Sequence, residues 1–313
     1  MMTRDSYVFI LGAGSAKPFG FPTGDELYQH ICKIYPTHVE MGLPKSEAET
    51  FTTQLRLTTG VSIDRYLNVN KGFKNIGTHS IATAIHFFEE RAKANLLKQG
   101  DWLTYLYQMM IQGLNTPEDF LRIHENKVSF VTFNYDRSVE HFLFSNLYGL
   151  LRNAEIKQEQ VAKTILQVPI IHVYGKIGYL PWERGTYRDE FCDYQNPCTV
   201  SYGFDKAPAV GFLAGSTHEM IDLIYEQRQN NPDIQRAKEC IQKASCVIFL
   251  GFGYEEMNLS ILGLPRLLEE KRILGTGLGK TEKELSQIRH LLRTGAKIDI
   301  LDCDCLVLLR KML

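Results

Sequence analysis

Four short segments of the chain combine glycine with polar or titratable side chains, and each follows a run of apolar residues. They are Gly12-Ala13-Gly14-Ser15, Asn134-Tyr135-Asp136, Tyr174-Gly175-Lys176 and Gly251-Phe252-Gly253. Glycines allow a backbone to approach a phosphate closely, and free amides at the start of a following helix donate to it. The amide of Asn134 can order a water, the carboxylate of Asp136 can hold its loop or stabilise developing positive charge, and His172 can accept a proton near neutral pH. These residue types suit the binding of a phosphorylated ligand and the hydrolysis of one of its bonds.

The elements that must position these segments are strands of a parallel sheet. Continuous apolar runs, typical of strands buried on both faces, occupy residues 7–11, 128–133, 168–174 and 246–250. Shorter strands are predicted at 272–274 and 297–301, with helices at 217–228, 232–243 and 281–292. Strands that alternate with helices predict an α/β fold with a Rossmann-like doubly wound parallel sheet, in which ligands bind beyond the carboxyl ends of the strands. We therefore expect the four segments to converge on one crevice.

A mostly helical stretch separates the first two predicted strands. Ile81, Ile85 and Phe88 keep helical spacing, and no strong strand pattern occurs between about residue 37 and residue 125. No internal repeat or low-complexity tract is present. We predict a single domain over residues 1–313, with residues 37–125 as a helical insertion within it.

The composition excludes several classes of protein. The 313 residues are 44% hydrophobic and 23% charged, with a net charge of −1, which argues against broad nucleic-acid or membrane-surface binding. No apolar stretch approaches the ~20 residues that a membrane span needs, and the N-terminus has no apolar signal region. Seven scattered cysteines without a C-x-x-C pair are typical of reduced thiols. We therefore expect a cytoplasmic protein without a metal site.

The glycine and asparagine segments resemble signature motifs of the sirtuin family. Residues 12–16, followed by Gly20-Phe21-Pro22, are similar to the sirtuin Gly-Ala-Gly turn with its Gly-x-Pro, and residues 132–136 are similar to Thr-Gln-Asn-x-Asp. Residues 251–254 fall where sirtuins carry a ribose-contacting Gly-Thr-Ser turn. The Thr-Phe-Asn-Tyr-Asp form and the segment 62–67 look more like the sirtuin-like NAD-hydrolysing effectors of bacterial anti-phage defence than like deacylases.

This resemblance implies an NAD⁺ glycohydrolase (NADase), which cleaves the nicotinamide–ribose bond of its substrate NAD⁺ to give nicotinamide and ADP-ribose. Asn134 would order the attacking water, aided by Asp136 and by His172 or Tyr174. Pro22 would shape the nicotinamide side of the site. The expected NAD-binding residues are Gly12, Ala13, Gly14 and Ser15 at the pyrophosphate, Gly251, Gly253 and Asn258 at the adenosine ribose, and Gly275, Thr276 and Gly277 at the adenine end.

The chain departs from the family pattern at the histidine. Sirtuins carry a His directly before the glycine that ends the third strand, but this chain has Tyr174 before Gly175, and His172 lies two residues upstream. In a strand, the side chains of His172 and Tyr174 would face the same side, about 6.6 Å apart. Either His172 reaches the substrate from one pleat back, or Tyr174 occupies the family position as a hydrogen-bonding residue and catalysis rests mainly on Asn134 and an oriented water.

The zinc module of the deacylases is also missing. The corresponding interval, residues 177–216, contains only Cys192 and Cys198, and two cysteines cannot form a four-cysteine site. The interval is rich in aromatic residues, glycine and proline, so it is predicted either as a loop that covers the nicotinamide pocket or as a structured surface loop. Thr23-Gly24-Asp25 stands where deacylases have Asp-Phe-Arg. We therefore expect no bound zinc and no peptide deacylation.

Uncontrolled loss of NAD⁺ would kill the host cell, and no sensor domain is evident beside the predicted catalytic domain. We therefore expect control by assembly, through a homo-oligomer or a separate sensor or regulatory subunit, with the helical insertion as the contact surface. No membrane and no direct nucleic-acid contact is expected. The alternative is a protein with little or no turnover, namely an NAD⁺ or ADP-ribose sensor or a scaffold subunit of a defence complex.

Overall fold

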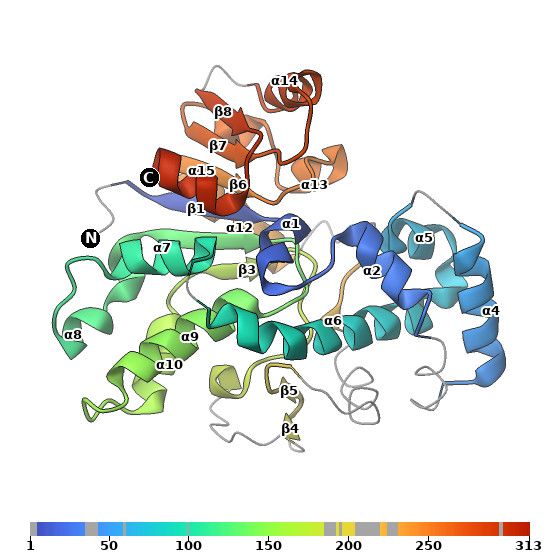
Figure 1. Cartoon of the computed structure of the whole chain (residues 1–313), viewed down its shortest axis with the longest axis horizontal. Coiled ribbons are helices and arrows are strands. Elements are labelled where there is room, and N and C mark those ends of the chain that lie inside the picture. Colours follow the sequence, from blue (N-terminus) through green and yellow to red (C-terminus); the bar gives the residue numbers. More distant parts are fainter. Residues whose placement is uncertain are drawn as a thin grey trace.

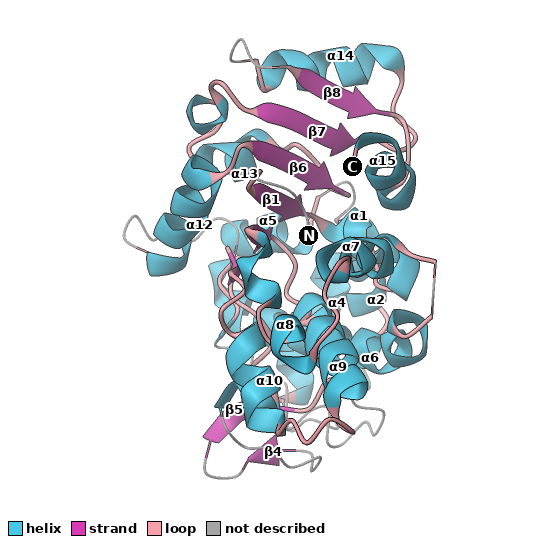
Figure 2. Ribbon diagram, turned by 90° about the vertical axis from the view of Figure 1, so that its left-hand side faces the viewer, coloured by secondary structure: helices cyan, strands magenta, loops and turns pink. Residues whose placement is uncertain are grey.

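Six parallel strands form the centre of the structure. The computed structural model describes residues 5–34, 43–58, 61–98, 100–184, 192–193, 196–203, 220–223, 231–293 and 297–313. The strands are β1 (Tyr7–Leu11), β2 (Val128–Thr132), β3 (Ile170–His172), β6 (Cys246–Leu250), β7 (Arg272–Thr276) and β8 (Ile298–Leu301). Every neighbouring pair is parallel, and Figure 2 shows β1, β6, β7 and β8 side by side and pointing the same way. The predicted α/β fold with a Rossmann-like sheet is confirmed.

The order of the strands reverses next to β1. The sheet has the order β3-β2-β1-β6-β7-β8. Numbered within this sheet alone, that order is 3-2-1-4-5-6, which is typical of doubly wound folds. All five residues of β1 are buried, and the strand pairs with β2 on one side and β6 on the other. The crevice in which such sheets bind ligands therefore lies beyond the carboxyl ends of β1 and β6.

Helices flank this sheet. Those before β2 are α1 (Ala13–Ala16), α2 (Gly24–Ile31), α4 (Lys45–Arg56), α5 (Ile63–Val69), α6 (Lys74–Leu96), α7 (Trp102–Ile111) and α8 (Pro117–Phe120). The later ones are α9 (Ser138–Leu151), α10 (Gln158–Ile165), α12 (Pro232–Lys243), α13 (Glu256–Ile261), α14 (Glu282–Leu291) and α15 (Cys305–Met312). Short 3₁₀ turns are η1 (Lys17–Phe19), η2 (Lys71–Phe73), η3 (Ile123–Asn126), η4 (Pro181–Arg184) and η6 (Arg266–Leu268). Among the described residues, no helix has the length and apolar character that crossing a membrane would require.

The described part of the segment between α2 and β2 contains helices joined by short turns and no strand. Figure 1 shows α4 and α5 at one end of the molecule, with the long helix α6 leading from them toward the sheet. Phe51 of α4 and Ile81 of α6 belong to the same cluster of buried residues as Phe9 of β1. These helices therefore share one hydrophobic core with the sheet.

The third strand is shorter than its apolar run predicts. β3 ends at His172, and residues 173–174 form a turn in which the amide of Gly175 donates to the carbonyl oxygen of His172 (3.3 Å). Gly175 has a φ of +75°, and a Cβ there would lie 1.9 Å from the carbonyl oxygen of Met220. Because the chain leaves the extended conformation after His172, the expectation that His172 and Tyr174 share one face of a strand is wrong.

The interval predicted as a loop contains a small antiparallel ribbon. β4 (Cys192–Asp193) pairs with β5 (Asn196–Val200), and the amide of Val200 donates to the carbonyl oxygen of Tyr179 (2.8 Å). Residues 185–191 and 204–216 lie outside the described residues, as do residues 217–219 and 224–228 of the helix predicted at 217–228. The idea that this interval covers a pocket stays a prediction.

Candidate functional site

The backbones after β1 and β6 pack against each other at the point where the strand order reverses. The amide of Gly12 donates to Leu250 and the amide of Gly14 donates to Gly251, each to a carbonyl oxygen at 3.0 Å. A Cβ on Gly251, which has a φ of +56°, would lie 1.9 Å from the amide nitrogen of Ser15. Cβ atoms on Gly12 and Gly14 would lie 2.6 Å and 2.8 Å from the backbone of Gly251. This packing accounts for all three glycines, and their contact with a pyrophosphate, like that of Ala13, stays a prediction.

Asn134 reaches the glycine turn from the end of β2. Its side-chain nitrogen Nδ2 lies 3.2 Å from the carbonyl oxygen of Gly12 and 3.5 Å from Oγ of Ser15. The hydroxyl of Ser15 donates to the same Gly12 oxygen (2.8 Å). The backbone amide of Asn134 donates to Oγ1 of Thr132 (3.0 Å). The structure therefore brings the predicted catalytic asparagine and the predicted phosphate-binding turn into direct contact.

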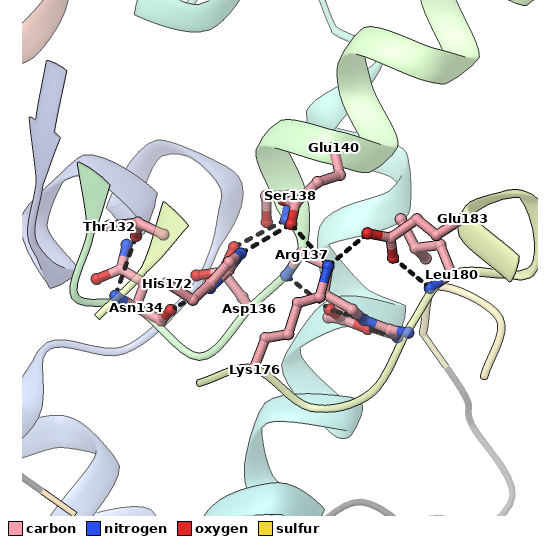
Figure 3. Close-up of polar contacts among 11 residues, drawn as sticks. Thr132, Asn134, Asp136, Arg137, Ser138, Glu140, His172, Lys176, Leu180 and Glu183 are labelled. Carbon is pink, nitrogen blue, oxygen red and sulfur yellow. Dashed lines mark hydrogen bonds and ion pairs between the residues drawn. The ribbon is translucent and has the colours of Figure 1, made fainter. Parts of the chain in front are cut away.

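His172 lies beside Asn134 and is held at both ring nitrogens. Nδ1 is 2.9 Å from the backbone carbonyl oxygen of Asn134, and Nε2 is 2.7 Å from Oε1 of Glu140, in the first turn of α9. The side chains of His172 and Glu140 are both buried. Figure 3 shows the ring between these two oxygens. In this arrangement the ring contacts the loop that carries Asn134.

Glu140 is the first member of a buried chain of charges. Nζ of Lys176 lies 3.3 Å from Oε1 of Glu140 and also contacts Glu183, which in turn accepts from the amide of Leu180 (2.6 Å) (Figure 3). Burial by itself raises the pKa of Glu140, but the charges of His172 and Lys176 outweigh it and hold the pKa below its ordinary value. Glu140 is therefore a carboxylate, and sequence reasoning missed it because a lone Glu on a helix carries no motif.

Asp136 is buried at the start of α9. Its Oδ1 accepts from the amide of Ser138 (3.0 Å), so the carboxyl group closes the turn that leads into the helix. Burial raises the pKa of Asp136 to about 6, against hydrogen bonds from Ser138, and the charge of Glu89 adds to the rise while that of His172 opposes it. Asp136 therefore closes the turn into α9 and has a pKa close to neutral, and a catalytic role for it stays a prediction.

A fully buried ion pair ties the helical segment to the Asn134 loop. The guanidinium of Arg137 donates to both carboxylate oxygens of Glu89 on α6, with Nη2 at 2.6 Å from Oε2. The same guanidinium donates to the carbonyl oxygens of Val200 (2.6 Å) and Ser201 (3.0 Å). One side chain therefore connects three parts of the chain, and no local sequence pattern points to it.

The segment 62–67, which the sequence singled out, also reaches this loop. The hydroxyl of Tyr135 donates to Oδ1 of Asp64 on α5 (2.8 Å) and contacts the carbonyl oxygen of Asp222 (3.3 Å). Burial raises the pKa of Tyr135, and the charge of Asp64 raises it further. The tyrosine in the middle of the Asn-Tyr-Asp motif is therefore a buried hydrogen-bond donor that connects the loop after β2 to α5.

Tyr174 and His172 contact different parts of the chain. Its hydroxyl donates to Oδ1 of Asn258 on α13 (2.7 Å). The ring of Phe133 lies between those of Tyr174 and Phe252, with centroid distances of 5.4 Å and 5.1 Å. Two residues predicted for different parts of the site, Tyr174 and Asn258, are thus direct partners.

The predicted adenine end is packed by protein groups. The amide of Gly251 donates to Oγ1 of Thr276 (2.8 Å), and the hydroxyl of Tyr254 donates to the carbonyl oxygen of Thr276 (3.0 Å). A Cβ on Gly275 would lie 2.2 Å from the Tyr254 hydroxyl, and one on Gly277 would lie 2.4 Å from Leu285. These contacts account for the glycines on their own.

Two other predicted residues lie in more open positions. A Cβ on Gly253 would meet nothing within 4 Å, and Gly253 is exposed. Pro22 is partly exposed and precedes Thr23, whose side chain forms a capping box with Glu26 at the start of α2. Lys17 and the Thr23 amide hold the pKa of Glu26 at about 2. The surrounding packing does not require a glycine at 253, and contact of Gly253 and Pro22 with a ligand stays a prediction.

Within the ranges that the structure describes, no group of three or more His, Cys, Asp or Glu side chains is arranged to hold a metal ion. The side chains of Cys192 and Cys198 lie outside the described residues. No protein-family model and no curated protein matches the chain.

Proposed function

We propose that the protein is an NAD⁺ glycohydrolase that releases nicotinamide and ADP-ribose. The observation that carries the proposal is the position of Asn134, whose side-chain amide lies 3.2 Å from the Gly12 carbonyl oxygen at the reversal of strand order. Doubly wound sheets bind nucleotides at that point. The resemblance to sirtuin motifs supports NAD⁺ as the substrate, because the corresponding asparagine of sirtuins lies next to the ribose of NAD⁺.

The proposed reaction breaks the bond between C1′ of the ribose and the nicotinamide nitrogen. The bonding electron pair moves to the nicotinamide, the sugar passes through an oxocarbenium-like state, and a water held by Asn134 adds its oxygen to C1′. The carboxylate of Asp136 contributes negative charge near the Asn134 loop, where the proposed positive charge develops. Asp136 has a pKa of about 6, so it is able to take up the proton that the water loses near neutral pH.

The proposed biological role is that of a bacterial anti-phage defence effector that depletes NAD⁺ when activated. This part rests on the sirtuin-like resemblance of the motifs. Control by a homo-oligomer or by a separate sensor subunit belongs to the same proposal. A single purified chain that hydrolyses NAD⁺ at full rate as a monomer would contradict it.

A second candidate is an NAD⁺ or ADP-ribose sensor with little turnover. The observation that favours it is that both ring nitrogens of His172 and the hydroxyl of Tyr174 are engaged by protein groups. Neither side chain therefore has a group directed to a substrate in this arrangement. A sensor would bind NAD⁺ without releasing nicotinamide.

Nicotinamide release separates the two candidates. Wild type and Asn134→Ala are incubated with NAD⁺, as the chain alone and together with whatever co-purifies from the native cell. Asn153→Ala, at an exposed asparagine, is the matched control. The proposal expects release by wild type and by the control and none by Asn134→Ala. NAD⁺ binding without release in every sample would favour the sensor.

A further inference from the structure

The peptide group of Asn134 contacts His172, which in turn contacts Glu140, and the proposed reaction gives this pair no role. Nδ1 of His172 lies 2.9 Å from the Asn134 carbonyl oxygen, and Nε2 lies 2.7 Å from a carboxylate oxygen of Glu140. Both of these partners are hydrogen-bond acceptors. A neutral imidazole has one donor and one acceptor nitrogen, so it can satisfy only one of the two contacts.

The charge state of Glu140 decides which form of the ring is present. A protonated Glu140 could donate to a neutral ring, but Nζ of Lys176 lies 3.3 Å from the same Glu140 oxygen, and its positive charge favours the ionised carboxylate whatever the state of His172. With Glu140 ionised, both ring nitrogens must carry a proton. His172 is then an imidazolium that donates to Asn134 on one side and to Glu140 on the other.

The charged groups around this pair come from several elements. Lys176, after β3, contacts the same oxygen of Glu140 at 3.3 Å and pairs with Glu183 of η4. Asp136, from the loop after β2, interacts with the charge of His172. The formal charges of Glu140, His172, Lys176 and Glu183 cancel, which makes a buried imidazolium compatible with its surroundings.

We propose that Glu140 is a positioning residue for NAD⁺ hydrolysis, which keeps His172 doubly protonated so that the ring clamps the Asn134 peptide and does not act as the base. The kinetic part of this inference rests on the proposed function. The clamp fixes the backbone from which the Asn134 amide reaches Gly12 and Ser15. If the His172 ring no longer holds the Asn134 peptide, kcat falls while KM for NAD⁺ stays nearly unchanged, because the glycine turn does not depend on this contact.

Substitutions at His172 distinguish a clamp from a base. His172→Asn places an amide donor close to the position of Nδ1 but has no group that accepts a proton near neutral pH. The clamp predicts that His172→Asn keeps kcat within about tenfold of wild type while His172→Ala loses about 100-fold or more. Equal loss in both variants would overturn the clamp. His290→Asn, at an exposed helical histidine, is the matched control.

A double-mutant cycle tests whether Glu140 acts through His172. Glu140→Gln is expected to lower kcat roughly tenfold in the wild-type background. In the His172→Asn background it should have little further effect, because the shorter asparagine does not extend to Glu140. Equal losses in the two backgrounds would contradict the proposed path. Glu159→Gln is the control, since Glu159 also lies in the first turn of a helix but is exposed.

Nuclear magnetic resonance tests the clamp independently of activity. In protein labelled with ¹⁵N-histidine, the His172 signals are those that disappear in His172→Asn. The inference predicts protons on both ring nitrogens at neutral pH in wild type and on one nitrogen in Glu140→Gln. A single protonated nitrogen in wild type would overturn it. If wild type releases no nicotinamide under any condition, the proposed function fails, while this spectrum still decides the charge of His172.

Discussion

The hydroxyl of Tyr174 donates to Oδ1 of Asn258 at 2.7 Å, and this bond joins the turn after β3 to the helix that follows β6. Two strands, β2 and β1, separate β3 from β6 in the sheet. The bond therefore spans the carboxyl edge of the sheet at the place where the strand order reverses. The ring of Phe133 packs against the ring of Tyr174.

Removing the hydroxyl of Tyr174 tests whether it is structural. Tyr174→Phe loses the bond to Asn258, so we expect the free energy of unfolding to fall by about 1 kcal/mol. The value of kcat should stay within about tenfold of wild type, because the hydroxyl faces Asn258. Urea denaturation and nicotinamide release measure the two effects. A large loss of kcat at unchanged stability would instead show a chemical role for the hydroxyl.

Tyr107→Phe is the matched control. The hydroxyl of Tyr107 is buried and has no hydrogen-bond partner among the residues that the structure describes. Its removal should leave stability unchanged or raise it slightly, since no bond is lost. Equal destabilisation of both variants would mean that the ring environment, and not the bond to Asn258, determines the result.

The glycines at the crevice differ in what surrounds them. A Cβ at Gly251 would lie 1.9 Å from the Ser15 amide at a φ of +56°, whereas one at Gly253 would meet nothing within 4 Å. Gly251→Ala should therefore lower the free energy of unfolding by roughly 3 kcal/mol or prevent folding. Gly253→Ala should change it by less than about 0.5 kcal/mol. Thermal and urea unfolding of both variants measure this, and similar stabilities would contradict the close packing of β1 and β6.

Asp136 makes stability depend on pH. Its pKa in the folded protein is about 6 and its ordinary value is 3.8, so the folded state binds this proton more tightly than the unfolded chain. The contribution of Asp136 to the free energy of unfolding therefore falls as pH rises from about 4 to 6. Asp136→Asn keeps an acceptor for Ser138 but carries no charge. We expect the variant to gain stability relative to wild type over that range, by an amount on the order of 2 kcal/mol.

Urea unfolding of wild type and Asp136→Asn at several pH values measures this difference. Groups far from Asp136 also titrate in this range, but they are common to both proteins and cancel in the comparison. A difference that does not change between pH 4 and 6 would show that burial does not raise the pKa of Asp136 in the folded protein.

The buried pair of Arg137 and Glu89 should be costly to break. Arg137→Met leaves the Glu89 carboxylate buried without its partner, so the free energy of unfolding should fall by about 3–5 kcal/mol. Replacing both residues by Met and Gln should cost less than the sum of the single changes. Arg122→Met, in the exposed pair with Glu125, is the control and should change stability by less than about 1 kcal/mol. Equal effects at the two sites would contradict the buried pair.

The strands were predictable because buried parallel strands are continuous apolar runs. β1 and β6 match their predicted bounds, and the contact between Asn134 and the Gly12 turn follows from the rule that such sheets gather their carboxyl ends. The end of β3 was not predictable, because Val173 and Tyr174 continue the apolar run while Gly175 bends the chain. The partners of His172 were missed for another reason: Glu140 lies 32 residues away, and no periodicity links two residues so far apart.

The central claim is that Asn134 directs water to NAD⁺ in the crevice between β1 and β6. The most direct test measures NAD⁺ binding by calorimetry and ADP-ribose formation by mass spectrometry on the same samples of wild type and Asn134→Ala. We expect both proteins to bind NAD⁺ with similar affinity and only wild type to form ADP-ribose. Equal rates in the two proteins, or binding by wild type without any ADP-ribose, would contradict it.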